Sequence, residues 1–512
     1  MDVILIVDTG SSSMRGILFD RQGSIVYCRQ EKYFMDVQPD GSAEQDPLEY
    51  ANALRLVCES CGKFAAENRL RIAALSFTSQ RSSILPLDSS GKPLSRIITW
   101  YDKRSSDICR RMLELHGDEI YRIAGMRPIP VLSAPKIAWL KETHPDIYRN
   151  AHKIVGIHDY LLYLATGKFV TDDTLASRTC LMDTASRQWS LRLLALFDIS
   201  QDKLCTLLPA GSIAGTVTQT FAAKTCLAVG IPVISAGGDQ QCSVLGQGLL
   251  QPGQAGITVG TGAYLASVTD HPINDPEKRV NINAAVTPGH WILEASTLSA
   301  GAVYDWVNRL FSDWEGKGGA IQHLNAAAEQ SPPGANGVVM LPDLAGKGCP
   351  EWNDWARGLF CNLSFSTTRG DMARAALEGV AAEIAQCHQI LRSLNARVAS
   401  VHVTGGLAKF SLFDQILADM LEYPVERCII EETTAIGAFL AGSTAIGWYS
   451  SLKEAAGQIG VGKAGNVFYP QKDHSLLYRK INTLRAQVSA AIPHAALAEL
   501  NGCNEGRETS EK

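Results

Sequence analysis

Short apolar runs alternate with small and polar residues along the chain, and their lengths predict an alternation of strands and helices. Residues 3–7 form a continuous apolar run, and residues 15–19 and 24–27 follow it across two turns, so we expect adjacent strands beginning with a hairpin. Residues 47–67 have a helical pattern with Asp46 as N-cap and Pro47 at the first helical position. Residues 71–77 predict a buried strand and residues 83–87 another.

The second half of the chain repeats this order. The first half also contains two expected helices, over 133–143 and 158–166. In the second half, the strands 256–259 and 263–268 flank another glycine-rich loop. The later expected elements are helices 299–311, 370–395, 411–422 and 433–447, and strand 401–404. Strand, loop, strand and then αβ units in both halves indicate an internal duplication and an α/β fold class.

Length and composition bound the architecture and the partners. A chain of 512 residues is too long for one ordinary core, so we expect domains over 1–247 and 248–490. Residues 491–512 are expected to be disordered, because the stretch from Asn501 to the end has almost no apolar residues. A net charge of −5 gives no nucleic-acid signature, and no apolar run reaches the ~18 residues of a membrane span. Asp2 stands where a signal peptide carries basic residues, and 13 scattered cysteines fit a reducing cytoplasm.

Two glycine-rich loops carry the candidate chemistry. Residues 8–13 (D-T-G-S-S-S) follow the first strand, and residues 260–262 (G-T-G) follow the strand 256–259. Glycine allows close backbone approach, and the loop N–H groups and hydroxyls then converge where an oxyanion can sit. Residues 237–241 (G-G-D-Q-Q) lie between the two loops and contain the isolated carboxylate Asp239. The pattern predicts a cleft that holds a nucleoside triphosphate and deprotonates an acceptor.

A polar strip, residues 78–82 (T-S-Q-R-S), separates two apolar strands. Open α/β sheets bind ligands at the ends of their strands. Amide and guanidinium groups suit vicinal hydroxyls, so Gln80 and Arg81 are candidates for holding a polyhydroxylated acceptor.

The chain resembles the FGGY family of carbohydrate kinases, within the sugar kinase, Hsp70 and actin superfamily. The segments that carry the resemblance appear in family order: residues 8–12 in the first phosphate loop, 41–47 as G-x-x-E-Q-D-P, 100–104 as W-x-D-x-R, 136–140 in the first signature, 237–241 as the glycerol kinase form of the catalytic segment, and 405–406 with 434–438 on the adenosine side. The resemblance extends to about residue 490. It implies two duplicated ribonuclease-H-like (actin-like ATPase) domains facing a central cleft.

The resemblance also implies roles for individual residues. Asp239 is the expected general base, and Asp8 and Asp239 are the expected Mg²⁺ ligands. The expected substrate contacts are Gln80, Arg81, Trp100, Asp102, Asp159, Asp239 and Gln240. The expected ATP contacts are Thr9, Gly10, Ser11, Ser12, Arg15, Gly260, Thr261, Gly262, Gly301, Asp305, Gly405, Gly406 and Lys409.

Each assignment competes with a purely structural role. Asp239 alone is compatible with an Asx-turn, Asp8 with hairpin capping, and Arg15 with a surface salt bridge. The competing roles at the remaining positions are core packing for Trp100, an ion pair for Asp102 with Arg104, an N-cap for Asp159, tight backbone packing for Gly405 with Gly406, and a solvated face for Asp305. His158 and His402 are expected to be satisfied local histidines.

Two departures from the family pattern bear on the substrate. Asn362 replaces a glycine of the second signature, which concerns a turn and not the chemistry. Ser82 follows Arg81 where glycerol kinases carry Glu, so an acceptor for two polyol hydroxyls is missing.

We therefore expect ATP-dependent phosphorylation of a hydroxyl on a small sugar or polyol, such as a pentulose, with ATP and Mg²⁺. Alternatives are a glycerol kinase, an autoinducer-type linear sugar kinase and, more remotely, a non-enzymatic actin- or Hsp70-like nucleotide switch. The sequence leaves open the acceptor, its reacting hydroxyl, the pathway, the regulation and whether the chain forms a homodimer.

Overall fold

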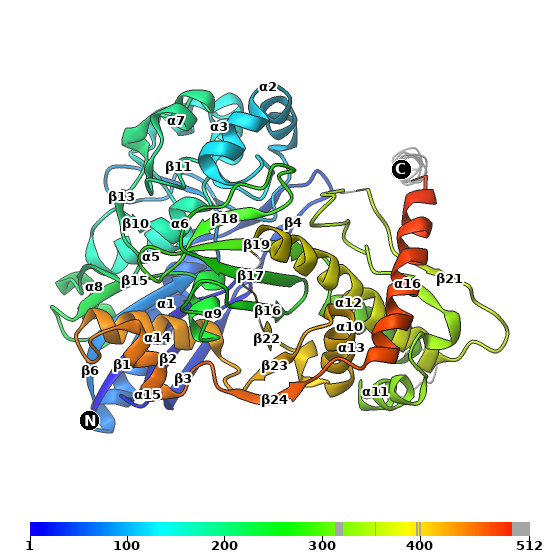
Figure 1. Cartoon of the computed structure of the whole chain (residues 1–512). Helices are drawn as coiled ribbons and strands as arrows, with labels where there is room; N and C mark the ends of the chain where they lie inside the picture. The colour runs from blue at the N-terminus through cyan, green and yellow to red at the C-terminus, as the bar shows by residue number, and fades with distance from the viewer. Residues whose placement is uncertain (313–320, 354, 396–397, 399–400, 494–512) are drawn as a thin grey trace, which may run out of the picture. The chain divides into compact units, whose positions relative to one another are not determined.

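The computed structural model describes residues 1–312, 321–353, 355–395, 398 and 401–493 (Figure 1). Residues 494–512 of the predicted disordered tail lie outside this part, whereas residues 491–493 are described. The chain divides into two compact units. Unit 1 contains 1–252, 268–293 and 432–463, and unit 2 contains 253–267, 294–431 and 464–512. No described helix is both long and apolar enough to cross a lipid bilayer.

A six-stranded sheet forms the centre of unit 1. Its order is β14-β15-β6-β1-β2-β3, in which β15, β6 and β1 run parallel and the other neighbours antiparallel. The bounds are β1 Asp2–Thr9, β2 Ser13–Phe19, β3 Ile25–Lys32, β6 Arg71–Ser79, β14 Ser212–Thr216 and β15 Pro232–Gly238. The hairpin and the strand 71–77 were predicted.

Side-chain alternation gives this sheet two buried faces. Val3, Leu5 and Val7 belong to a core with helices α1 (Pro47–Glu67) and α5 (Ile157–Thr166). On the opposite face Ser76 donates a hydrogen bond of 2.8 Å to a carbonyl of α14 (Thr433–Ala445). A sheet covered by helices on both faces is the α/β arrangement expected from near-continuous apolar strands.

The predicted helix starts and ends agree with local capping. The Asp46 carboxylate accepts from the Leu48 N–H, and Pro47 begins α1. Gly167 ends α5 with a left-handed φ of 72°. The strand predicted over 83–87 is only β7, Leu85–Leu87, and Ile84 before it forms an isolated antiparallel bridge with Ile98.

The remaining elements of unit 1 include a long helix that was not predicted, α2 (Ser106–Ala124). The others are β4 Asp36–Val37, β5 Ala43–Gln45, β8 Ile97–Ile98, α3 Ser133–Thr143, α4 Pro145–Asn150, β9 Lys153–Val155, β10 Val170–Asp172, α6 Asp173–Ser177, β11 Met182–Asp183, β12 Gln188–Trp189, α7 Leu191–Leu196, η1 Gln201–Lys203, β13 Thr206–Leu208, α8 Gln219–Thr225, α9 Asp239–Gly246, β18 Asn281–Ala284 and α15 Leu452–Ile459.

The second sheet repeats the strand order of the first. It contains β17, β16, β22, β23 and β24 consecutively, with β16 and β17 as an antiparallel hairpin, β16, β22 and β23 parallel, and β24 antiparallel. These strands correspond in order and direction to β2, β1, β6, β15 and β14. The predicted duplication is therefore present in the topology.

The helices of unit 2 surround its longest one, α12 (Arg369–Leu394), which was predicted over 370–395. The bounds in this half are β16 Ala255–Val259, β17 Ala263–Thr269, β19 Trp291–Thr297, α10 Gly301–Ser312, α11 Ile321–Gln330, η2 Ala335–Gly337, β20 Val339–Leu341, β21 Leu359–Cys361, β22 Val401–Thr404, η3 Leu407–Lys409, α13 Ser411–Leu421, β23 Val425–Cys428, β24 Ala464–Phe468 and α16 Lys472–Ala491. Asn362 has a φ of 62°, a conformation that Gly and Asn tolerate, so its replacement of a glycine concerns a turn.

Candidate active site

Three parallel strands of unit 1 end at the same edge of the sheet. Asp8 on β1 pairs with Thr78 on β6, and Thr78 pairs with Gly237 on β15. At the usual strand spacing, Asp8 and Gly237 therefore lie about 10 Å apart. This register brings the first phosphate loop, the polar strip and Asp239 to one edge.

Asp239 is the first residue of α9, directly after β15. Its side chain is 28% exposed and lies 3.5 Å from Nε of Arg81, whose own side chain is 8% exposed. Oδ1 of Asp239 also accepts from the Gln240 N–H at 2.7 Å. The carboxylate is thus oriented by its own helix and by a buried cation from the neighbouring strand end, while part of it remains open to a ligand.

A buried network holds the turn before Asp239. Gly237 has a φ of 130°, and the Gly238 N–H donates to Oγ1 of Thr174 at 2.9 Å. Thr174 donates in turn to Asp172 at 2.5 Å, and Asp172 accepts from Ser235 at 2.6 Å. Burial raises the pKa of Asp172. Asp172 and Thr174 were not predicted as site residues; a polar run at 171–174 within apolar surroundings was the available signal.

His158 makes a local contact, but it is only partly satisfied, because its buried Nδ1 has no hydrogen-bond partner among the described residues. Its Nε2 lies 2.8 Å from Oγ of Ser235, and burial lowers its pKa to about 3. His402 likewise forms a local pair, with Glu426 at 3.6 Å.

The first phosphate loop is tied to the polar strip. Ser11 Oγ donates to Gln80 Oε1 at 3.3 Å and accepts from Nε1 of Trp100 at 2.9 Å. The Gly10 N–H donates to the Ser13 carbonyl at 2.9 Å, which closes the loop. Ser11 is partly exposed and Ser12 exposed, whereas the Thr9 side chain is fully buried.

A chain of side-chain hydrogen bonds runs beneath this loop. Gln80 Nε2 donates to the Tyr50 hydroxyl at 2.6 Å, and that hydroxyl donates to Gln45 Oε1 at 2.7 Å. Gln45 then donates to the Ser11 carbonyl at 2.9 Å. Gln45 belongs to the 41–47 motif, so this motif supports the phosphate loop.

Arg15 makes the salt bridges that were its competing structural role. Its two Nη atoms lie 2.6 Å from Asp8 and 2.6 Å from Glu432. Burial raises the pKa of Asp8, and the Arg15 cation acts against that shift. Glu432 was not predicted as part of the site.

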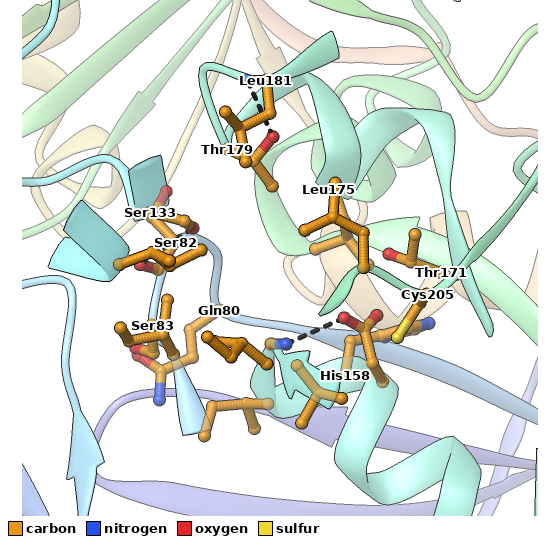
Figure 2. Close-up of a pocket in the computed structure, with 18 of the residues that line it drawn as sticks. Gln80, Ser82, Ser83, Ser133, His158, Thr171, Leu175, Thr179, Leu181 and Cys205 are labelled. Carbon is orange, nitrogen blue, oxygen red and sulfur yellow. Dashed lines mark hydrogen bonds between the residues drawn. The ribbon is translucent and has the colours of Figure 1, made fainter. Parts of the chain in front are cut away.

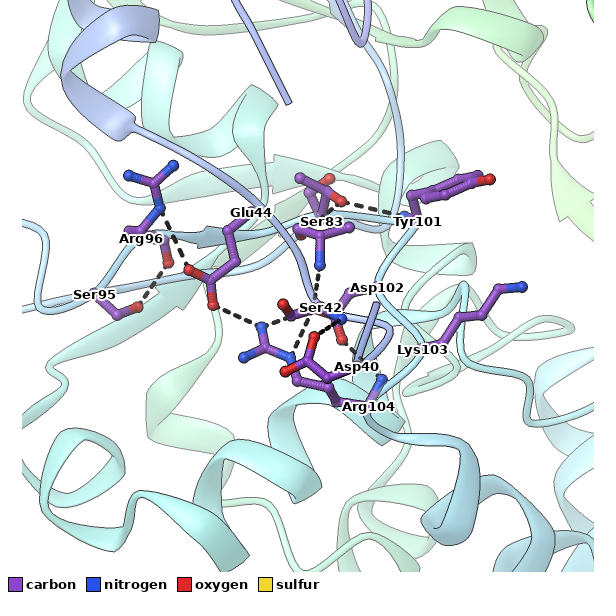
Figure 3. A network of polar contacts seen from close by, with 12 residues as sticks. Asp40, Ser42, Glu44, Ser83, Ser95, Arg96, Tyr101, Asp102, Lys103 and Arg104 are labelled. Atoms are coloured by element: carbon purple, nitrogen blue, oxygen red, sulfur yellow. Dashed lines mark hydrogen bonds and ion pairs between the residues drawn. The ribbon is translucent and has the colours of Figure 1, made fainter. Parts of the chain in front are cut away.

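The segment 100–104 forms the predicted ion pair (Figure 3). Asp102 is 1% exposed, and its Oδ2 accepts from the Ala43 N–H at 2.9 Å and from Arg104 Nε at 2.9 Å. Arg104 also pairs with Glu44 at 2.7 Å. The network joins the motifs at 41–47 and 100–104.

A small cavity of about 40 Å³ lies behind the polar strip (Figure 2). Its lining includes Gln80, Ser82 and the buried Asp159. Oδ2 of Asp159 accepts from the Gly156 N–H at 2.8 Å, and Gly156 is the N-cap of α5, so the N-cap role for Asp159 is wrong. Oδ1 of Asp159 accepts no hydrogen bond from a described group, and burial raises the pKa of this carboxyl to about 6. The cavity has room for a few water molecules.

In unit 2 the second phosphate loop rests on the start of α10. The Gly301 N–H donates to the Gly260 carbonyl and the Ala300 N–H to the Thr261 carbonyl, both at 2.8 Å. A Cβ on Gly301 would stand 2.5 Å from the Gly260 carbonyl, which accounts for glycine there. Gly262 is partly exposed and Thr261 exposed, so the loop keeps a hydroxyl at its surface.

The other predicted nucleotide contacts in unit 2 differ in their surroundings. Gly405 has a φ of 105°, and a Cβ there would lie 2.3 Å from the Val259 carbonyl, whereas a Cβ on Gly406 would meet open space. Lys409 pairs with Glu431 at 2.7 Å, and Asp305 is exposed on α10. Tight packing therefore explains Gly405, and Gly406 is the more open of the two.

Comparisons with known proteins identify the family. The N-terminal domain of the FGGY family of carbohydrate kinases matches residues 3–246, and its C-terminal domain matches residues 255–446. A gluconokinase of Bacillus licheniformis is 28% identical over 495 residues, covering 95% of each chain. A glycerol kinase of Bordetella parapertussis is 31% identical over 479 residues, covering 89% of this chain and 91% of that protein.

A solved xylulose kinase from Lactobacillus acidophilus superposes with a TM-score of 0.89 at 25% identity, covering 96% of this chain and 98% of that one. The α/β fold, its duplication and the matches across both halves agree with one another. The chain belongs to the FGGY family of carbohydrate kinases, enzymes that transfer a phosphoryl group from ATP to a sugar or polyol.

Proposed function

We propose that Asp239 is the general base of this kinase and that a small ketose or polyol, such as a pentulose, is its acceptor. The observation that carries the proposal is the placement of Asp239. Its partly open carboxylate stands at the strand edge that also holds the first phosphate loop, with the buried Arg81 cation 3.5 Å away.

In the proposed reaction Asp239 takes the proton of the attacking hydroxyl. The freed oxygen forms a bond to the γ-phosphorus while the bond from that phosphorus to the β–γ bridging oxygen breaks, and ADP leaves. N–H groups and hydroxyls of residues 10–12 and 260–262 stabilise the charge on the phosphoryl oxygens. Catalysis of this kind is mainly positioning and electrostatic stabilisation.

We propose Mg²⁺ as the accompanying ion. It needs only one or two carboxylates, because phosphate oxygens and water supply its other ligands. Asp8 is a buried carboxylate at the strand edge, held by Arg15 and next to the loop, and it fits this role. Asp239 is the second candidate. Bound Mg²⁺ would neutralise charge on the phosphates.

The polar strip supports an acceptor other than glycerol. Ser82 replaces the carboxylate that glycerol kinases carry, and its hydroxyl donates to the Arg178 carbonyl at 3.3 Å. Arg81, Gln240 and the Trp100 ring are the contacts we propose for the sugar. Asp102 has both oxygens engaged by Arg104 and the backbone, so we propose that it positions the 100–104 segment. Glycerol and linear signalling sugars remain the alternatives.

Asp239→Asn tests the base. The amide keeps the size of the side chain but cannot accept the proton, and loss of a general base typically costs ~10²–10⁴ in rate. We expect single-turnover phosphoryl transfer to fall by that factor while calorimetric ATP affinity stays near wild type. Asp146→Asn, which removes an exposed carboxylate on α4, is the matched control.

A transfer rate close to wild type in Asp239→Asn would exclude Asp239 as the base. Loss of ATP binding in the same variant would instead assign the carboxylate to the nucleotide or its metal. The acceptor itself is found by measuring ADP release over a panel of pentuloses, hexuloses, gluconate and glycerol.

We extend the proposal to the cellular compartment, the cytoplasm, and to the oligomeric state, a homodimer. All described cysteines are free thiols, which supports a reducing cytoplasm. Light scattering on the purified chain distinguishes a monomer from the homodimer.

A further inference from the structure

A cavity of about 500 Å³ lies within unit 2, outside the elements that carry the proposed active site. Its lining comes from the second half of α12, the C-terminal half of α16, Leu341 of β20 and the segment around Lys347. Its volume falls in the range of pockets that bind small molecules.

Three charged side chains that line the cavity are at least nine-tenths buried. Lys347 is 6% exposed, Glu383 6% and Arg485 5%. Charged residues are almost never buried to this extent unless they are paired, so each of them needs a partner. The exposed residues Gln389, Ala486 and Ala490 form the rim.

The contacts within unit 2 leave Glu383 incompletely satisfied. Lys347 Nζ lies 3.9 Å from Glu383 but donates its hydrogen bond to Glu351 at 2.9 Å. None of the described residues donates a hydrogen bond to the Glu383 carboxylate. Burial raises its pKa to about 7, with Asp343 and Glu351 adding to the shift and Lys347 and Arg485 opposing it.

Arg485 also keeps donor capacity. Its Nε donates to the Met340 carbonyl at 3.1 Å and its Nη1 to Asn482 at 2.7 Å. Nη2 donates to no group in the described part of the chain, so this arginine has spare N–H groups.

The lining matches one class of ligand. When Glu383 is ionised, the charges of the lining cancel, with Lys347 and Arg485 against Glu351 and Glu383, and this balance favours a molecule without net charge. A hydroxyl both donates and accepts, so vicinal hydroxyls can donate to Glu383 and accept from Arg485. The apolar residues Leu341, Ala382 and Ala385 offer a surface to C–H groups.

We propose that this cavity is a second carbohydrate site, separate from the catalytic one, which binds a neutral polyol or sugar. Glu383 accepts from its hydroxyls and Arg485 donates to them. The proposal goes beyond the phosphoryl transfer proposed above and does not depend on which acceptor is phosphorylated.

Hydrogen exchange of the full chain with xylitol, sorbitol or glycerol, without ATP, tests the proposal. We expect at least one of these polyols to protect α16 over 482–491 and α12 over 382–389. Ala486→Trp places a large ring at the rim of the cavity on α16, and Gln389→Trp places one at the rim on α12. We expect each substitution to block the cavity and abolish the protection by polyol. Gln487→Trp, an exposed residue one position along α16 that does not line the cavity, is the matched control and keeps it.

Glu383→Gln keeps the shape but loses the charge, and we expect about tenfold weaker polyol binding at this site, or about 1.4 kcal/mol. Absence of protection with all three polyols overturns the proposal. So does protection that persists in both rim variants, or protection by gluconate alone, which would assign the cavity to anions. Because the readout is local exchange, a failed base test at Asp239 leaves this result unaffected.

Discussion

At the scale of single residues, Lys136 in the first family signature is a buried lysine held by backbone. It is 0% exposed, and its Nζ donates to the carbonyls of Val131, Leu132 and Ser82 at 2.5, 3.0 and 3.3 Å. Ser82 follows Arg81 and has a φ of 72°. Lys136 therefore fixes the backbone of the polar strip, and we interpret it as a positioning residue that acts through Arg81.

Lys136→Met removes these three donors at similar volume. We expect the KM for the sugar to rise about tenfold or more, because each buried carbonyl left without a donor costs about 1–3 kcal/mol and the strip can move. The KM for ATP should change little. Lys136→Arg, which keeps donors, should recover part of the sugar affinity; a uniform loss of activity in both would indicate a folding defect alone.

The same lysine gives stability a defined pH dependence. Burial lowers its pKa from 10.5 to about 7, with Arg178 acting in the same direction and Asp102 and Cys109 against it. Between these values the unfolded chain holds a proton that the folded chain has lost, so this contribution to stability rises with pH. The free energy of unfolding, measured with urea, should rise with pH over that range more steeply in wild type than in Lys136→Met. Parallel plots of this free energy against pH would contradict the shifted pKa.

At the scale of secondary structure, local signals predicted the elements with clear caps and periods. Asp46 and Pro47 fix the start of α1, and the strands around both glycine-rich loops lie where their apolar runs end. The strand 83–87 was predicted two residues too long. The turn at Ser82 just before it, with a φ of 72°, accepts a hydrogen bond from Lys136, 54 residues away. Local pattern contains no information on such a contact.

The same limit applies to the site. Asp239 stands out because a lone Asp follows two glycines after an apolar strand. Thr174, which binds the Gly238 N–H, lies 64 residues earlier, and Glu432, which binds Arg15, lies in a different part of the chain. Their roles come from tertiary packing and were not predicted.

Gly405→Ala tests the contact between β22 and β16. The φ of 105° and a Cβ 2.3 Å from the Val259 carbonyl require β16 to shift just before the second phosphate loop. Strain at such a position costs about 1–3 kcal/mol, so we expect lower stability together with weaker ATP binding.

Gly406→Ala is the matched control, because a Cβ there meets open space and the φ of −62° is ordinary. It should fold with wild-type stability. Weaker ATP binding in this stable variant would support the contact proposed between Gly406 and the nucleotide, whereas wild-type affinity would argue against it. Equal stability of the two variants would contradict the packing role of Gly405.

At the scale of the whole molecule, the duplication gives each unit one glycine-rich loop between a strand and its hairpin partner. Relatives that are named for gluconate, glycerol and xylulose share this architecture. Relatives with different acceptors therefore share one architecture, and we propose that side chains such as Arg81 and Ser82 select the acceptor of this chain.

The last prediction concerns closure. The proposed base and sugar contacts belong to unit 1, whereas the second loop and Gly406 belong to unit 2. Transfer requires the reacting oxygen and the γ-phosphorus to come together with water excluded, which in many enzymes is achieved by domain closure. We therefore expect small-angle scattering to give a smaller radius of gyration with sugar and a non-hydrolysable ATP analogue together than without ligands. Either ligand alone should give a smaller change, because it engages only part of the groups. Ligand concentrations should be shown by calorimetry to be saturating. Identical scattering profiles for the free chain and the ternary complex would then contradict closure, and the proposed contacts would have to be in place for transfer before the ligands bind.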